Sequence, residues 1–175
     1  AGIGRGDKIV ICGRNSTYWA ISFFATITYG AVAVPLLHEF KSEAVTHLVN
    51  HSDGKLLIVG DVVWEGLDAD EMPNLCAAIQ MQNFELVSCK DERFKQAYQS
   101  IKDDFLATYP DGFTKEDVSY QRDRLDDLAL INYTSGTTSM SKGVMLSYRA
   151  LLSNYMFACE VLPNLCAGMN VISML

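Results

Sequence analysis

Basic residues are a minority in this 175-residue sequence, in which 14 lysines and arginines stand against 21 aspartates and glutamates. The formal net charge is −7 at pH 7. A protein that grips nucleic acid through a broad surface needs many basic side chains facing the phosphates. The composition therefore argues against a nucleic-acid partner, whereas a small anionic ligand held by one local loop is compatible with it.

Paired cysteines and a secretory signal are also missing. The five cysteines are an odd number without a closely spaced pair, so the sequence predicts neither a disulfide framework nor a CxxC metal site. Residues 1–7 lack the basic region followed by an apolar run that export requires. We therefore expect a cytoplasmic protein with buried thiols. The cysteines are Cys12, Cys76, Cys89, Cys159 and Cys166.

Charge is absent from Asn15 to Leu37, the one stretch that suggests a membrane. Serine and threonine interrupt this stretch, and Gly30 with Pro35 indicates a helix end followed by a short strand. We favour a buried helix and strand over a transmembrane helix, so no transmembrane segment is expected.

Strand-like and helix-like segments alternate along residues 1–90, which favours parallel pairing of the strands. With 49% hydrophobic residues and the length of one domain, the chain is expected to form a doubly wound α/β fold, a mostly parallel sheet with flanking helices. Strands are predicted at Lys8–Cys12, Ala31–Leu36, Leu56–Val59 and Phe84–Val87. Helices are predicted at Tyr18–Tyr29 with Ser16 as N-cap, Ser42–Asn50 with Ser42 as N-cap, Val62–Leu67 and Leu75–Met81.

The second half divides into a charged helix with a linker (residues 91–127) and a region that resumes the sheet (residues 128–175). Apolar residues recur at helical spacing in the predicted helix Glu92–Thr108, and we interpret this stripe as core packing. The sequence stops inside an apolar run, so we expect an incomplete domain. The apolar stripe of the helix consists of Phe94, Tyr98, Ile101 and Phe105. Beyond the linker, strands are predicted at Leu128–Tyr133 and Val144–Leu146, and a helix at Tyr148–Val161 with Ser147 as N-cap.

The segment Tyr133–Val144 contains six serine or threonine side chains, two glycines and Lys142 between two strand-like runs. Such a loop suits a polyphosphate, because glycine frees backbone N–H groups, hydroxyls donate hydrogen bonds and lysine supplies a mobile positive charge. Hydroxyl oxygens also suit Mg²⁺. The loop is not a Walker A motif, because Ser141 and Gly143 occupy the places of its second glycine and its serine or threonine.

Three other interpretations remain open: an ordinary surface turn at Tyr133–Val144, a histidine metal site and a serine nucleophile. Composition alone is also compatible with an ordinary surface turn rich in serine and threonine. His47 and His51 lie four residues apart but lack a third metal ligand, which favours a solvated helix end. Ser135 has no G-x-S-x-G context, so a serine nucleophile is weakly supported.

Residues 133–144 resemble the signature of the adenylate-forming (AMP-binding) superfamily, Y-T-S-G-T-T-G-x-P-K-G-V, and nine positions match as they stand. Within that superfamily, Gly6–Ile11 and Tyr29–Leu36 resemble the N-terminal part of bacterial long-chain fatty-acid–CoA ligases. The resemblance implies that residues 1–175 are an incomplete N-terminal AMP-binding domain. Three residues depart from the usual pattern, with Ser139 for glycine, Ser141 for proline and Tyr148 where relatives often have histidine.

The resemblance implies a two-step reaction in which ATP converts a carboxylic acid, here a long-chain fatty acid, to an acyl-adenylate that coenzyme A then captures. ATP, Mg²⁺ and coenzyme A are the implied ligands, and activity at a membrane surface is consistent with a long-chain acid. The implied phosphate-binding residues are Thr134, Ser135, Gly136, Thr137, Thr138, Ser139, Lys142 and Gly143, with Thr134 as the Mg²⁺ contact.

No catalytic residue is assigned within the 175 residues, because the family's catalytic lysine and its adenine-binding and ribose-binding motifs lie further along the chain. The fragment alone is therefore expected to be inactive. Two alternatives stay open at this point: an adenylating enzyme that loads a carrier protein, and a non-catalytic scaffold that has lost phosphate binding through Ser139 and Ser141.

Overall fold

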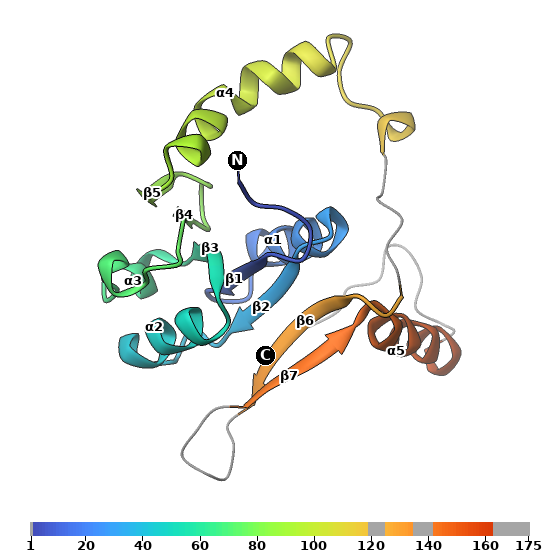
Figure 1. Cartoon of the computed structure of the whole chain (residues 1–175). Coiled ribbons are helices and arrows are strands. Elements are labelled where there is room, and N and C mark those ends of the chain that lie inside the picture. The colour runs from blue at the N-terminus through green and yellow to red at the C-terminus, as the bar shows by residue number, and fades with distance from the viewer. Residues whose placement is uncertain (1, 119–124, 135–141, 163–175) are drawn as a thin grey trace.

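The computed structural model describes residues 2–118, 125–134 and 142–162, and these form one seven-stranded sheet with helices packed against it (Figure 1). The strand order across the sheet is β5-β4-β3-β1-β2-β6-β7. The strands are β1 Lys8–Cys12, β2 Val32–Leu36, β3 Gly54–Val59, β4 Ala77–Gln80, β5 Leu86–Cys89, β6 Leu128–Thr134 and β7 Lys142–Ser147.

Helices connect most of these strands. They are α1 Thr17–Tyr29, α2 Ser42–His51, α3 Asp61–Trp64, α4 Glu92–Thr108 and α5 Tyr148–Val161, with short 3₁₀ helices at Ala69–Glu71 and Lys115–Asp117.

The sheet is mostly parallel, as the alternating sequence pattern predicts. Strands β4, β3, β1, β2 and β6 all run in one direction, whereas β5 and β7 pair antiparallel at the two edges. After β1 the chain adds β2 on one side, and β3 then returns to the other side of β1. This reversal is the switch point of a doubly wound α/β sheet, so the predicted fold class is confirmed.

The charge-free stretch forms a helix followed by a strand, as predicted. Ser16 is the N-cap of α1, and its hydroxyl accepts a hydrogen bond from the Trp19 N–H at 3.1 Å. Gly30 ends the helix with φ at +87°, a left-handed conformation that glycine adopts without a steric penalty. Within the described ranges, no helix combines the length and apolar character needed to span a membrane.

One predicted helix is wrong. Leu75–Met81 contains strand β4, which pairs in parallel with β3 and antiparallel with β5. Alanine favours helices intrinsically, but Ala77 and Ala78 are only 1% and 0% exposed between their neighbours. Tertiary burial therefore decided this segment. The predicted N-cap of α2 is also wrong, because Lys41 occupies that position without a side-chain cap and Ser42 is the first helical residue.

The two faces of the sheet carry separate apolar clusters. Side chains alternate along a strand, so Val10 packs on the same face as Val45 and Leu48 of α2. Ile9 packs on the opposite face, where Trp19 of α1 and Phe94 of α4 cover the sheet. The central strands are thus buried on both sides, which explains their nearly continuous apolar sequences.

The predicted aromatic stripe of α4 packs on the core only at its beginning. Phe94 is 7% exposed and lies in the cluster beneath α1, whereas Ile101 and Phe105 are 62% and 47% exposed. Figure 1 shows the yellow end of α4 extending away from the sheet. The interpretation of the whole stripe as core is therefore wrong for its second half.

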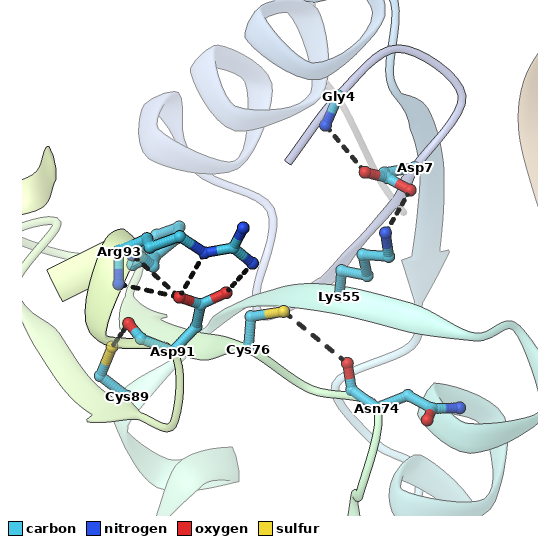
Figure 2. Close-up of polar contacts among 9 residues, drawn as sticks. Gly4, Asp7, Lys55, Asn74, Cys76, Cys89, Asp91 and Arg93 are labelled. Carbon is cyan, nitrogen blue, oxygen red and sulfur yellow. Dashed lines mark hydrogen bonds and ion pairs between the residues drawn. The ribbon is translucent and has the colours of Figure 1, made fainter. Parts of the chain in front are cut away.

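An ion pair joins the amino ends of two central strands. Lys55 of β3 lies 2.8 Å from the Asp7 carboxylate, which also accepts a 2.7 Å hydrogen bond from the Gly4 N–H (Figure 2). Burial raises the pKa of Asp7, but the bonds from Gly4 and Lys55 outweigh it and hold this pKa below its usual value of 3.8. The ionised carboxylate therefore stabilises the folded state above that pH and stops doing so as the pH falls through the lowered pKa.

We expect Asp7→Asn to reduce the free energy of unfolding at pH 7 by roughly 1 kcal/mol, because Lys55 is partly exposed and water screens the pair. The difference from wild type should shrink as the pH falls below about 4, where the carboxylate of the unfolded chain begins to bind a proton, and should vanish below the lowered pKa of native Asp7. Urea unfolding measured from pH 7 to pH 3 checks this, with the exposed Asp103→Asn as the matched control. A difference that stays constant across that range would contradict the assignment.

Candidate functional site

The predicted phosphate loop connects two adjacent antiparallel strands at the edge of the sheet. Strands β6 and β7 lie side by side (Figure 1). Their register ends with Thr134 opposite Lys142. The two predicted strands on either side of the loop are thereby confirmed. Five of the predicted phosphate-binding residues lie outside the described residues, and their roles remain predictions; they are Ser135, Gly136, Thr137, Thr138 and Ser139.

The structure places the other three predicted residues together at the base of the loop. Thr134 and Lys142 are directly paired across the two strands, and both side chains are exposed. Gly143 follows and pairs with Tyr133. A hydroxyl and an ammonium group therefore stand at the same end of the hairpin, which suits hydrogen bonding and charge neutralisation of a phosphate chain. Their roles as ligands are still a prediction.

Gly143 lies where a side chain would collide with its neighbours. A Cβ atom built there would come within 3.0 Å of Ile131 Cγ2 and 3.2 Å of Tyr133 Cε1. The Tyr133 ring therefore covers the backbone of the facing strand, and a side chain at this position would force Ile131 or Tyr133 to shift by a few tenths of an ångström.

We expect Gly143→Ala to weaken ATP-dependent activity of the full-length protein, meaning the complete protein that contains these 175 residues. The added methyl must push Ile131 or the Tyr133 ring aside, at a cost of roughly 1–3 kcal/mol. Kinetic assays at varied ATP check this, with Gly4→Ala as control because the nearest atom to its Cβ is 3.8 Å away. Equal activity of both variants would contradict the packing argument.

Tyr133 is held by a residue that the sequence did not connect to the loop. Its hydroxyl lies 2.7 Å from Nδ1 of His51, the last residue of α2, and the two rings meet edge to face at 5.7 Å. Burial and the negative charge of Asp53 raise the pKa of Tyr133. His51 was interpreted as part of a solvated helix end. Its side chain is exposed, but it has a specific partner 82 residues away, and no local pattern signals such a contact.

Tyr148, which stands where the superfamily often has histidine, anchors α5. Its hydroxyl donates a 2.7 Å hydrogen bond to the carbonyl of Ile27 in α1. The departure from the usual pattern therefore has a structural role, joining two helices that lie 121 residues apart in sequence.

A cavity of about 470 Å³ opens at the carboxyl ends of the strands beside the loop base. In open α/β sheets, ligands bind in crevices at this end of the strands. Asn132 and Tyr133 of β6 contribute one wall and Leu37 another. A second cavity of about 250 Å³ lies nearby, where Gly13 follows β1 and Gly60 follows β3.

Among the described residues, no set of three histidine, cysteine, aspartate or glutamate side chains is placed to hold a metal ion. His47 and His51 contact each other, with ring centres 5.9 Å apart, and gain no third ligand from that part of the chain. The predicted Mg²⁺ contact, Thr134, has an exposed hydroxyl beside Lys142, which fits an ion that arrives with a polyphosphate rather than one held by protein carboxylates.

Comparisons with known sequences match this arrangement to one family. A family model described as "AMP-binding enzyme" matches residues 1–174. 4-hydroxybutyrate--CoA ligase 2 of Metallosphaera sedula is 26% identical over 166 residues, which are 93% of this chain and 28% of that protein. Long-chain-fatty-acid--CoA ligase 5 of Rattus norvegicus is 29% identical over 152 residues, which are 83% of this chain and 22% of that protein. The chain thus spans about a quarter of these relatives.

Solved structures share the fold. A long-chain-fatty-acid-CoA ligase (FadD1) from Archaeoglobus fulgidus superposes with a TM-score of 0.66 at 22% identity, over 94% of this chain and 29% of that one. ATP-bound MatB from Rhodopseudomonas palustris superposes with a TM-score of 0.65 at 22% identity, over 91% of this chain and 28% of that one. The α/β architecture described above is therefore also found in these ligases.

Proposed function

Because this chain belongs to the AMP-binding enzyme family, we propose that the full-length protein uses ATP to convert a carboxylic acid to an acyl-adenylate. The observation that carries the proposal is the hairpin whose register pairs Thr134 with Lys142, two exposed residues at the base of the signature loop. The sequence signature and the pairing of the two residues at the described ends of the loop both support a phosphate-binding role for this hairpin.

In the proposed reaction, a carboxylate oxygen of the acid forms a bond to the α-phosphorus of ATP. The bond from that phosphorus to the oxygen bridging the β-phosphorus breaks, and pyrophosphate leaves with the negative charge. Lys142 would neutralise the β- and γ-phosphates, while Thr134 would hydrogen-bond to them. Positioned donors and cations are the main source of catalysis in such a step. Mg²⁺, when bound with ATP, would supply further neutralisation near Thr134.

We assign coenzyme A as the acyl acceptor and a long-chain fatty acid as the substrate within this proposal. The thiolate of coenzyme A would attack the acyl carbonyl and release AMP. Both relatives named above are CoA ligases by name, which supports the acceptor. Their named acids differ, 4-hydroxybutyrate in one and long-chain fatty acids in the other, so support for the acid comes from the sequence resemblance.

We further propose a cytoplasmic protein that associates with a membrane surface when its substrate is a long-chain acid. The free thiols of Cys12, Cys76, Cys89 and Cys159 are compatible with a reducing compartment. Burial raises the pKa of the Cys12 thiol to about 12, so this thiol is protonated and unreactive at neutral pH.

Product analysis tests the acid and the acceptor together. The full-length protein is incubated with ATP, Mg²⁺ and acids from acetate to palmitate, with coenzyme A or a phosphopantetheine carrier protein as acceptor. The proposal expects AMP and a CoA thioester, formed fastest with the long acids. A thioester on the carrier protein alone would replace the acceptor, and no AMP with any acid from a folded protein would favour the scaffold alternative.

A further inference from the structure

The contact between His51 and Tyr133 joins the end of a core helix to the strand that leads into the phosphate loop. The Nδ1 atom of His51 and the Tyr133 hydroxyl are 2.7 Å apart. Tyr133 is 8% exposed, and a buried phenol requires a hydrogen-bond partner. The hydroxyl can donate to unprotonated Nδ1 or accept from a protonated one, so the contact persists in either state of the imidazole.

Helix α2 provides a fixed support for this contact. Val45, Leu48 and Val49 of α2 are at most 2% exposed and pack against the central strands. His51 follows two residues after Val49, and the Ser52 hydroxyl bonds to the Val49 carbonyl at 3.0 Å. The imidazole therefore projects from the end of a helix whose position the core already determines.

The loop base lies three residues past the pairing of β6 with its neighbour β2. The β2–β6 register pairs Ala33 with Leu130, three residues before Tyr133. The Tyr133 ring covers Gly143 on the facing strand, and Tyr133 directly precedes Thr134. A displacement of the ring would therefore move both described ends of the loop, Thr134 and Lys142.

We propose that His51 is a positioning residue for ATP, which holds the Tyr133 ring against Gly143 and so sets the separation and orientation of Thr134 and Lys142. This inference rests on the proposed function. His51 touches no phosphate; it acts through Tyr133. Because a single hydrogen bond of this kind contributes modestly, its loss should raise the KM for ATP about three- to tenfold and change kcat much less.

Five variants of the full-length protein, one of them a control, test the pair by ATP-dependent pyrophosphate exchange. His51→Leu and Tyr133→Phe each remove one side of the hydrogen bond, and the double variant removes both. His51→Asn retains an amide oxygen or nitrogen near the position of Nδ1 and should restore most of the ATP affinity. His47→Leu removes an imidazole whose ring centre lies 5.9 Å from that of His51, and so is the control for losing this ring contact while the hydrogen bond to Tyr133 remains. Thermal unfolding of each variant separates loss of position from loss of folding.

The expected result is a similar rise in KM for the two single variants, no further rise in the double variant, and near-normal KM for His51→Asn and His47→Leu. Additive effects in the double variant would overturn the pairing. An unchanged KM for ATP in His51→Leu, together with reduced exchange in Lys142→Ala, would also overturn the positioning role of His51. That result would leave the proposed function intact. Absence of exchange in the wild-type protein would instead remove the proposed function, and this inference with it.

Discussion

Lys142→Ala is expected to lower the rate of AMP formation by the full-length protein at limiting ATP about 10²- to 10³-fold. Removing a preorganised charge or donor from a site where negative charge develops costs this much in comparable enzymes. Lys142 is the lysine of the signature loop and lies in the described part of the chain. It pairs with Thr134, so both side chains stand at the same end of the hairpin. Initial rates at varied ATP, with acid and coenzyme A saturating, measure the effect.

The matched control for this prediction is Lys102→Ala. Lys102 is an exposed lysine of α4, outside the hairpin, so it changes the net charge equally without altering the loop base. Its rate should stay close to that of the wild type. If both lysine variants lost activity equally, the effect would reflect overall charge and not a phosphate contact at Lys142.

Leu57→Ala is expected to reduce the free energy of unfolding by roughly 2–5 kcal/mol, the range for truncating a buried leucine. Leu57 is fully buried in β3, where it pairs with Val10 of β1 and Ala78 of β4. The substitution leaves a cavity where the sheet packs against α2. Since a domain is stable by only about 5–15 kcal/mol, so large a loss should lower the unfolding temperature visibly.

Calorimetry of the wild type, Leu57→Ala and Leu106→Ala checks this second prediction. Leu106 lies on α4 and is 54% exposed, so its truncation should have little effect. If the two leucine variants were equally stable, β3 would not be the buried interior strand that the sheet order makes it.

The sequence predicts those elements whose local signals agree with their surroundings. Helix Glu92–Thr108 has its predicted bounds, because Asp91 caps its first turn by accepting from the N–H groups of Arg93 and Phe94. The helix Tyr148–Val161 also has its predicted bounds, with Ser147 accepting from the Ala150 N–H. In both cases a capping side chain marks the first turn of the predicted segment.

Predictions failed where distant contacts decide the structure. Ala77 and Ala78 belong to a strand because they pair with β3 on one side and β5 on the other. The local sequence Leu75–Met81 does not indicate that these neighbouring strands will flank it. The exposed half of the α4 stripe shows the converse, since helical spacing alone does not supply a surface to pack against. The antiparallel edges formed by β5 and β7 likewise follow from the connections rather than from the strand sequences.

In the candidate site, too, the local signature could be read from the sequence, whereas a contact between distant residues could not. The signature from Tyr133 to Val144 identifies the phosphate loop as a hypothesis, and the structure confirms the strands that flank it. The His51 contact could not be predicted, because a histidine at a helix end is usually solvated and its partner lies on another strand. The division into residues 1–90, 91–127 and 128–175 and the role of each loop hydroxyl remain predictions.

The exchange of labelled pyrophosphate into ATP by the full-length protein, with and without a carboxylic acid, tests whether this protein forms an acyl-adenylate. Exchange requires reversible formation of an acyl-adenylate and needs no acyl acceptor. We expect exchange that depends on the acid, increases from acetate toward palmitate and falls sharply in Lys142→Ala. A folded protein that catalyses no exchange with any acid, or equal exchange with and without acid, would contradict this expectation.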